Sequence, residues 1–148
     1  MRNLFLFLHL AAAVFWMSGM AFVVMSLRPV AHVQLLPPVR LPFMVQVLRR
    51  FFVVVIVSIA VLLLTGVWLM LQVPGAQAPK GWHAMAGLGV VMMLVFGHIF
   101  FSPWRRAQQA VAAQDWPEGG KRMNQIALLV KVNLGLGWLA IAAVMLWR

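Results

Sequence analysis

Four long apolar runs constrain the fold of this chain more than any other feature of its sequence. They cover residues 4–27, 51–73, 82–102 and 123–147, and only the last contains a Lys or Arg. About 20 apolar residues in a helix cross the hydrocarbon core of a bilayer, and a helix satisfies its own backbone there. The sequence therefore predicts an all-α integral membrane four-helix bundle, organised as one four-span domain over residues 1–148.

Composition supports a membrane protein and excludes several other classes. Apolar residues make up 64% of the chain and charged residues 9%, against roughly half and a quarter in soluble domains. The absence of cysteine excludes disulfides, iron–sulfur clusters and thiolate metal sites. No nucleotide-binding glycine loop, Ser–His–Asp grouping or pair of catalytic carboxylates can be assembled, which argues against hydrolysis and phosphoryl transfer. The first run exceeds the roughly 7–15 apolar residues of a signal peptide, so we expect a retained span.

The connections between the runs differ in length and character. Residues 28–50 contain four prolines, which predicts an irregular or half-helical connection along the membrane interface. Residues 74–81 form a short turn. In the third connection, residues 105–114 are expected to continue the preceding helix into water. Asp115-Trp-Pro-Glu118 then has the form of a capping box and predicts a new helix, although two glycines follow it.

The positive residues predict how the chain is oriented. The two long connections carry Arg28, Arg40, Arg49, Arg50, Arg105, Arg106, Lys121 and Arg122, whereas the termini and the short turn carry Arg2, Lys80 and Arg148. The positive-inside rule then places the long connections in the cytoplasm and both termini outside. This placement also assigns the net charge of +10 to the membrane surface and its anionic lipids rather than to nucleic acid.

Two histidines are candidate ligands for a metal centre near the outer side of the bundle. In the predicted topology His9 and His83 lie at similar depth on the first and third spans, within roughly one or two helical turns. Facing imidazoles in a helix bundle can supply both axial ligands of a haem b. The alternative is that each histidine anchors a helix end near the headgroups.

The other two histidines, His32 and His98, each have two possible roles. His98 follows His83 by 15 residues, which places the two about 60° apart around one helix and about 22 Å apart along it. A second haem between His32 and His98 would require the chain to fold back after Pro29. Otherwise we expect His98 to hydrogen-bond within the bundle, and His32 to meet solvent or a haem propionate.

Lys131 carries the most costly charge in the sequence, because it interrupts the fourth span. If Lys131 faces the interior, it would pair with a haem propionate, bind an anionic quinone or porphyrin, or relay a proton. The alternative is that it snorkels to the interface. Arg28 is a second candidate for orienting acidic groups of a cofactor. Glycines on the third and fourth spans indicate either a flat macrocycle or close helix packing: Gly87, Gly89, Gly97, Gly135 and Gly137.

Methionines offer a different chemistry. The chain has eleven, and thioether sulfur is a soft ligand suited to Cu(I), so they could form a path for that ion. Methionine is also a common gap-filler in apolar bundles, and we expect most of them to serve that purpose. Those on the first and third spans are Met17, Met20, Met25, Met85, Met92 and Met93.

Three segments resemble the CopD (copper resistance protein D-like) family of small membrane proteins. They are His9-Leu-Ala-Ala-Ala-Val-Phe-Trp16-Met-Ser-Gly19-Met-Ala-Phe22 with Arg28-Pro29 closing the helix, the stretch from His98 to Pro117, and Val132-Asn-Leu-Gly-Leu-Gly137. The resemblance implies copper handling at the bacterial inner (cytoplasmic) membrane. The chain is also similar to the related HemJ-type protoporphyrinogen oxidases, which have four spans and bind haem b through histidine. It departs from them at Met85, where they have lysine, and at Gln125, where they have glutamate.

Three functional hypotheses follow. The first is a haem-b redox protein with His9 and His83 as ligands, which transfers electrons between a quinone or membrane redox partner and a substrate. If it is an enzyme, it is an oxidoreductase. The second is a copper-handling protein of the CopD type, which uses histidines and methionines. The third is a non-catalytic helper subunit of a larger membrane complex or homo-oligomer.

Overall fold

The computed structural model describes residues 1–147, which contain helices and no strand. The elements are α1 (Arg2–Phe22), the π-helical turn η1 (Val23–Leu27), α2 (Arg28–Gln34), α3 (Pro37–Leu71), the 3-10 turn η2 (Gly75–Gln77), α4 (Lys80–Phe101), α5 (Pro103–Ala112) and α6 (Trp116–Leu146). They form four continuous or kinked rods, each long and apolar enough to cross a membrane. The prediction of an all-α bundle with four spans is therefore confirmed.

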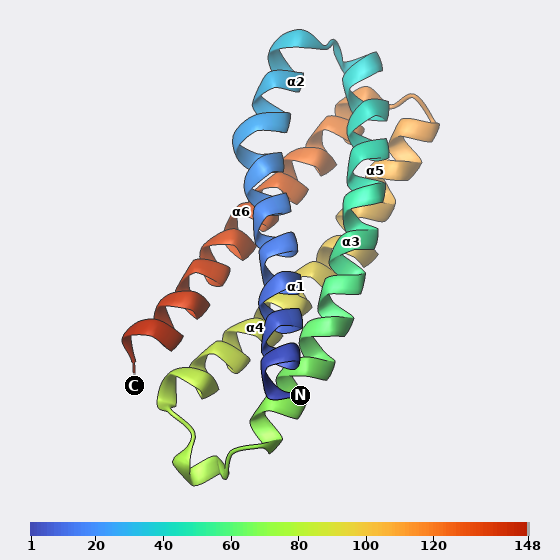
Figure 1. Cartoon of the computed structure of the whole chain (residues 1–148). Coiled ribbons are helices and arrows are strands. Elements are labelled where there is room, and N and C mark those ends of the chain that lie inside the picture. Colours follow the sequence, from blue (N-terminus) through green and yellow to red (C-terminus); the bar gives the residue numbers. More distant parts are fainter. Residues whose placement is uncertain (148) are drawn as a thin grey trace.

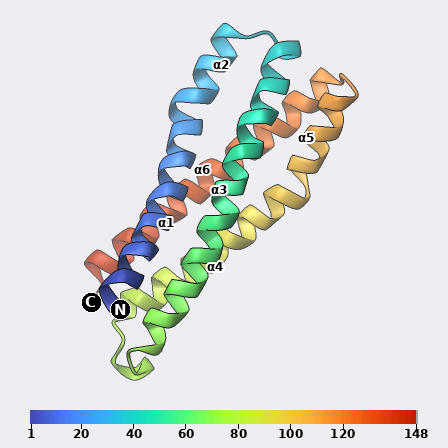
Figure 2. The ribbon, with the colours of Figure 1, turned by 45° about the vertical axis from the view of Figure 1, so that its right-hand side comes forward.

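The rods pack as two antiparallel hairpins. α1 lies along α3, and α4 lies along α6, while α6 supplies most of the contact between the hairpins (Figures 1 and 2). Both termini lie at the end of the bundle where α4 begins (Figure 1). This agrees with the expected placement of both termini on the same side.

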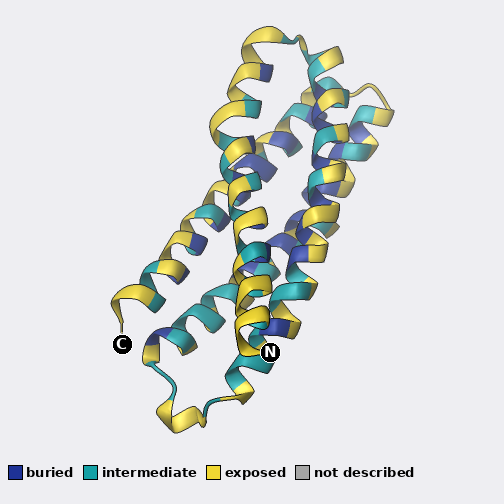
Figure 3. Cartoon of the chain, in the orientation of Figure 1, coloured by how far each residue is buried: buried dark blue, intermediate teal, exposed yellow. Residues whose placement is uncertain are grey.

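An aromatic cluster holds the two hairpins together. The Phe52 ring of α3 lies 4.9 Å from that of Trp104 and 5.4 Å from that of Phe96, both in edge-on arrangements. All three side chains are buried. Figure 3 shows that the rods carry buried residues along the sides where they meet and exposed residues elsewhere. Such pairs add about 0.5–1.5 kcal/mol each beyond the area they bury. The outer surface, by contrast, exposes large apolar side chains on every rod, as a surface covered by lipid requires.

The expectation of an irregular connection over residues 28–50 is wrong. The helix does not close at Pro29 but continues through α2, and only Leu35 and Leu36 are non-helical before α3 begins. Pro37 and Pro38 fall in the first turn of α3, where a backbone N–H has no helical partner to lose. Their effect is to start a helix rather than to break one.

Pro29 changes the hydrogen bonding of the helix one turn before it. It has no N–H for the carbonyl four residues before it, at Met25, and its ring crowds that carbonyl. The helix widens to a π turn over Val23–Leu27, immediately before Arg28. α1, η1 and α2 thus form one rod of 33 residues.

The third connection follows its sequence pattern. α5 extends the third rod beyond a kink at Ser102–Pro103, and α6 begins at Trp116. Asp115 Oδ1 accepts a hydrogen bond from the Glu118 backbone N–H at 3.3 Å, so the predicted helix start is confirmed. Gly119 and Gly120 do not interrupt α6, because the cap and the packing of α5 on α6 hold its first turns.

Candidate functional site

His9 lies on the side of α1 that faces α3. Its Nδ1 is 2.9 Å from Thr65 Oγ1, and a Cβ on the neighbouring Gly66 would lie 3.2 Å from its Cε1. The absence of a side chain at Gly66 therefore makes room for the imidazole. The ring is half-buried in an otherwise apolar part of the bundle.

The hydrogen bonds of Thr65 decide which ring nitrogen of His9 carries the proton. The hydroxyl donates its one hydrogen to the Val61 carbonyl oxygen at 2.6 Å, so toward His9 it can only accept. Nδ1 of His9 must then be the donor, and in the neutral ring Nε2 keeps its lone pair. Orientation of a histidine through one nitrogen, with the other left free, is the usual arrangement around a metal-ligating imidazole.

The structure does not assemble His9 and His83 as a pair. His83 is exposed at the beginning of α4, which packs along α6, whereas His9 is turned toward α3. Among residues 1–147 no three His, Asp or Glu side chains come close enough to hold a metal ion together. The haem site between His9 and His83 therefore stays a prediction.

The remaining predicted site residues lie apart from His9. His98 is exposed, like His83, and its ring makes no hydrogen bond among residues 1–147, so the expected bond within the bundle is not found. His32 is exposed on α2, where its Nδ1 lies 3.1 Å from the Arg28 carbonyl oxygen. Lys131 is exposed on α6 and does not face the interior of the bundle. Arg28 is partly buried, and its Nη2 donates to Asn124 Oδ1.

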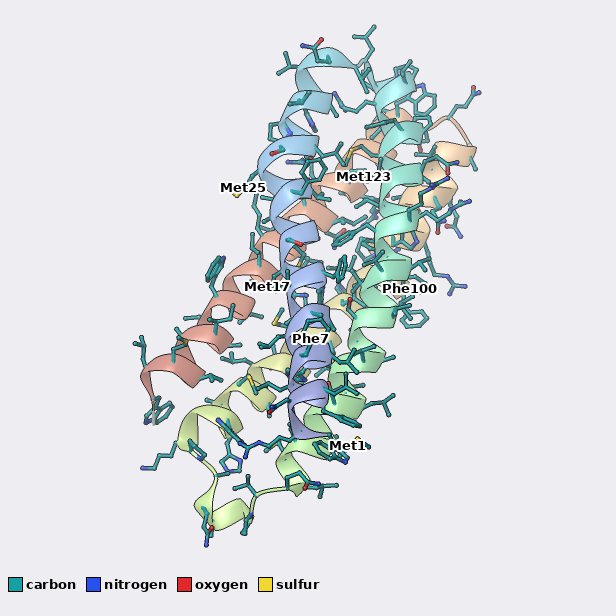
Figure 4. The ribbon with its side chains drawn as sticks, viewed as in Figure 1. Met1, Phe7, Met17, Met25, Phe100 and Met123 are labelled. Atoms are coloured by element: carbon teal, nitrogen blue, oxygen red, sulfur yellow. The ribbon has the colours of Figure 1, made fainter. Side chains whose placement is uncertain are left out.

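Two methionines meet in the middle of the bundle at Gly137. The Met17 sulfur from α1 and the Met92 methyl carbon from α4 both lie within 4 Å of the position that a Cβ on Gly137 would take, and Met17 would collide with it. Figure 4 shows Met17 beside α6, whereas Met25 projects from the surface. We call Met17, Met92 and Gly137 the thioether cluster. It brings side chains of α1 and α4 together against α6.

A buried amide lies one turn from Gly137. Asn133 is 1% exposed, and its Nδ2 donates to the Met92 carbonyl oxygen at 3.1 Å, which fixes α4 against α6. Its Oδ1 is buried and has no hydrogen-bond partner within residues 1–147. An unpaired buried acceptor costs about 1–3 kcal/mol, so this atom marks a place where a bound group or water would be stabilised.

The other methionines divide into core and surface. Met20, Met44 and Met123 are buried, whereas Met25 is 73% exposed. Six of the eleven methionines lie in the core or pack against it, which agrees with the expectation that most of them fill gaps there: Met17, Met20, Met44, Met92, Met93 and Met123. Sequence reasoning missed Thr65 and did not assign Asn133 a position. The signal for both is a polar residue inside an apolar run.

A bundle of four long apolar rods, with methionine side chains in its interior, defines a small multi-pass membrane protein. The family described as Copper resistance protein D matches residues 45–147, and the chain belongs to this CopD family. The matched residues include Met92, Asn133 and Gly137 and leave out α1, so the family match does not cover His9 or Met17.

A relative of the whole chain comes from Aquifex aeolicus (strain VF5). It is described as an uncharacterized protein and is 28% identical over 139 residues, which cover 92% of this chain and 94% of the relative. No solved structure matches the chain.

Proposed function

We propose that this protein handles copper in the bacterial inner membrane, binding Cu(I) through the thioethers of Met17 and Met92. The observation that carries the proposal is the meeting of these two methionines over Gly137, in the interior of a bundle whose family is named for copper resistance. Thioether sulfur prefers Cu(I) to harder ions, and the chain has no thiolate to compete for it.

Other features of the cluster support a binding role over simple packing. Asn133 Oδ1 gives the surroundings a buried acceptor for water on a hydrated ion, and no carboxylate lies in any of the four apolar runs to attract a harder cation. His9 offers a free Nε2 about 12 Å nearer the N-terminus of the same helix, at 1.5 Å per residue. We place it as a separate ligand for an ion that approaches the thioether cluster.

An anaerobic titration with Cu(I) against a chromogenic chelator tests the proposal. We expect wild-type protein to bind one equivalent, and Met17→Leu and Met92→Leu to weaken binding at least about tenfold, because each variant removes one of the two soft donors of the site. Met25→Leu is the matched control, since it changes an exposed methionine of the same helix.

A second pair of variants separates ligand loss from ligand position. Gly137→Val would push Met17 aside without removing any sulfur, whereas Gly135→Val adds the same bulk where a Cβ meets nothing within 4 Å. Only the first should weaken Cu(I) binding. Equal affinity in wild type, Met17→Leu and Met92→Leu would reject the cluster as a copper site.

A haem-b redox protein is the second candidate, favoured by one observation. Thr65 orients His9 so that Nε2 is free, which suits an axial ligand. An absorption spectrum of the same purified protein tests it: a Soret band that is lost in His9→Ala and in His83→Ala would support haem and would displace copper as the main function.

A further inference from the structure

A basic pocket lies where η1 and α2 meet the first turns of α3 and α6. Its volume is about 80 Å³, and Arg28, His32 and Arg40 form its polar wall. Its apolar side includes Met44, Leu48 and Val130. Asn124 also lines this space, which we call the basic pocket.

The chain supplies no carboxylate to neutralise this pocket. It has only two acidic side chains. Asp115 caps α6, and Glu118 accepts from Arg122 Nε at 2.6 Å. Neither lines the basic pocket, so two guanidinium groups face one space without a side-chain counter-charge. The charge balance of the site calls for an anion from outside the chain.

The hydrogen bonds of the two arginines leave donors available for such an anion. Arg28 uses Nη2 on Asn124, and Arg40 uses Nη1 on the Leu35 carbonyl oxygen at 3.5 Å. Arg40 Nε is buried and has no partner within residues 1–147. The planar arginine fork matches the oxygens of a phosphate or carboxylate, and a buried N–H of this kind is costly while unpaired.

The surroundings of the pocket distinguish a lipid from a soluble anion. At the tip where α2 turns into α3, the apolar side chains Val30, Val33, Leu36 and Val39 are 60%, 83%, 76% and 59% exposed. An apolar tip beside clustered arginines fits the headgroup region of the membrane, with the apolar residues among the acyl chains. Basic pockets between membrane helices bind anionic headgroups in this setting.

We infer that the basic pocket binds the phosphate group of an anionic phospholipid, whose oxygens are held by Arg28 and Arg40. His32 lies beside the phosphate, and the glycerol end of the lipid follows the apolar side formed by Met44, Leu48 and Val130. The bound lipid supplies the missing negative charge and an acceptor for Arg40 Nε. It also ties α2 and α3 to α6, whose early turns complete the pocket.

Native mass spectrometry of the full chain tests this inference. Wild-type protein in mild detergent is supplied with equal amounts of phosphatidylglycerol and phosphatidylcholine. We expect one phosphatidylglycerol to be retained in preference to phosphatidylcholine, and Arg40→Gln to lower its affinity about tenfold, as expected for one lost bond to a charged group. Arg40→Lys keeps the charge but not the planar guanidinium, so its affinity for phosphatidylglycerol should lie between those of wild type and Arg40→Gln.

Arg106→Gln is the matched control, because it removes an exposed positive charge of α5 that lies outside the pocket. Equal retention of both lipids by wild type, or equal losses in Arg40→Gln and Arg106→Gln, would overturn the site. The lipid assignment would fall if inorganic phosphate alone raised the thermal midpoint of delipidated protein as far as phosphatidylglycerol did, with the rise lost in Arg40→Gln. Cu(I) affinity of Arg40→Gln should equal that of wild type, so the test is independent of the copper proposal.

Discussion

At the scale of single residues, the most informative contact is the one between His9 and Thr65. The hydroxyl gives its hydrogen to its own helix and its lone pair to the imidazole, so one side chain on α3 sets the tautomer of a histidine on α1. The contact therefore fixes the orientation of the imidazole between the two helices.

Thr65→Val should lower the stability of the bundle by about 0.6–1.7 kcal/mol, the range of hydrogen bonds between membrane helices. Valine keeps the shape of threonine but removes the hydroxyl oxygen that lies 2.9 Å from Nδ1 of His9. Thermal unfolding in detergent measures the change, and nitrogen NMR of the imidazoles, assigned with His9→Gln, should report Nδ1–H in wild type. Ser18→Ala is the control, because Ser18 is exposed and its bond to the Phe15 carbonyl oxygen is long, at 3.5 Å. A Thr65→Val variant as stable as Ser18→Ala would contradict the assigned role.

Part of the candidate site could be predicted from the sequence, and part could not. The angle between His83 and His98 around α4 can be predicted by counting residues along a helix. The face that meets a neighbour does not, because it depends on which spans pair. α1 pairs with α3 rather than α4, which turns His9 toward Thr65 and leaves His83 exposed.

At the scale of helices, the sequence predicts where a helix begins when a single turn of local hydrogen bonds determines it. The start of α6 could be predicted because a cap is a local hydrogen bond between Asp115 and Glu118. The number of prolines in residues 28–50 did not predict the structure there, because the effect of a proline depends on its position. A proline opposes a helix in the interior but is compatible with the first turn, where Pro37 and Pro38 lie. α3 therefore begins at Pro37, well before the apolar run over residues 51–73.

Asp115→Ala should destabilise the first turn of α6 by about 1 kcal/mol, the usual cost of losing an N-cap. Hydrogen exchange of the backbone amides near Glu118 measures the effect, and faster exchange should be confined to that turn and to its contact with α5. Asp115→Asn retains the accepting oxygen and should behave as wild type. Unchanged exchange in Asp115→Ala would mean that packing against α5 alone holds this end of the helix.

At the scale of the whole molecule, the distribution of charge predicts the orientation of the bundle. The ends where α2 meets α3 and α5 meets α6 carry most of the arginines, and the termini lie at the opposite end (Figure 1). The positive-inside rule then assigns the arginine-rich end to the cytoplasm. The basic pocket would face the cytoplasmic leaflet, where anionic lipids contribute a negative surface potential.

Cysteine labelling tests this orientation directly, because the chain has no cysteine of its own. Ala76→Cys lies on the short turn and Ala113→Cys on the connection between α5 and α6, and both positions are exposed. A membrane-impermeant maleimide applied to intact spheroplasts should label Ala76→Cys, and should reach Ala113→Cys only after the membrane is opened. The reverse pattern would place the arginine-rich end outside.

The π turn over Val23–Leu27 amounts to one extra residue in the circumference of a helix. In a regular helix each added residue rotates everything beyond it by about 100° and advances it about 1.5 Å. A first rod of the same path without this insertion would carry Arg28 and His32 about a quarter-turn away from the pocket they line. The positive charge of that pocket thus depends on the rotation that the π turn gives to α2, as well as on the presence of arginine in the sequence.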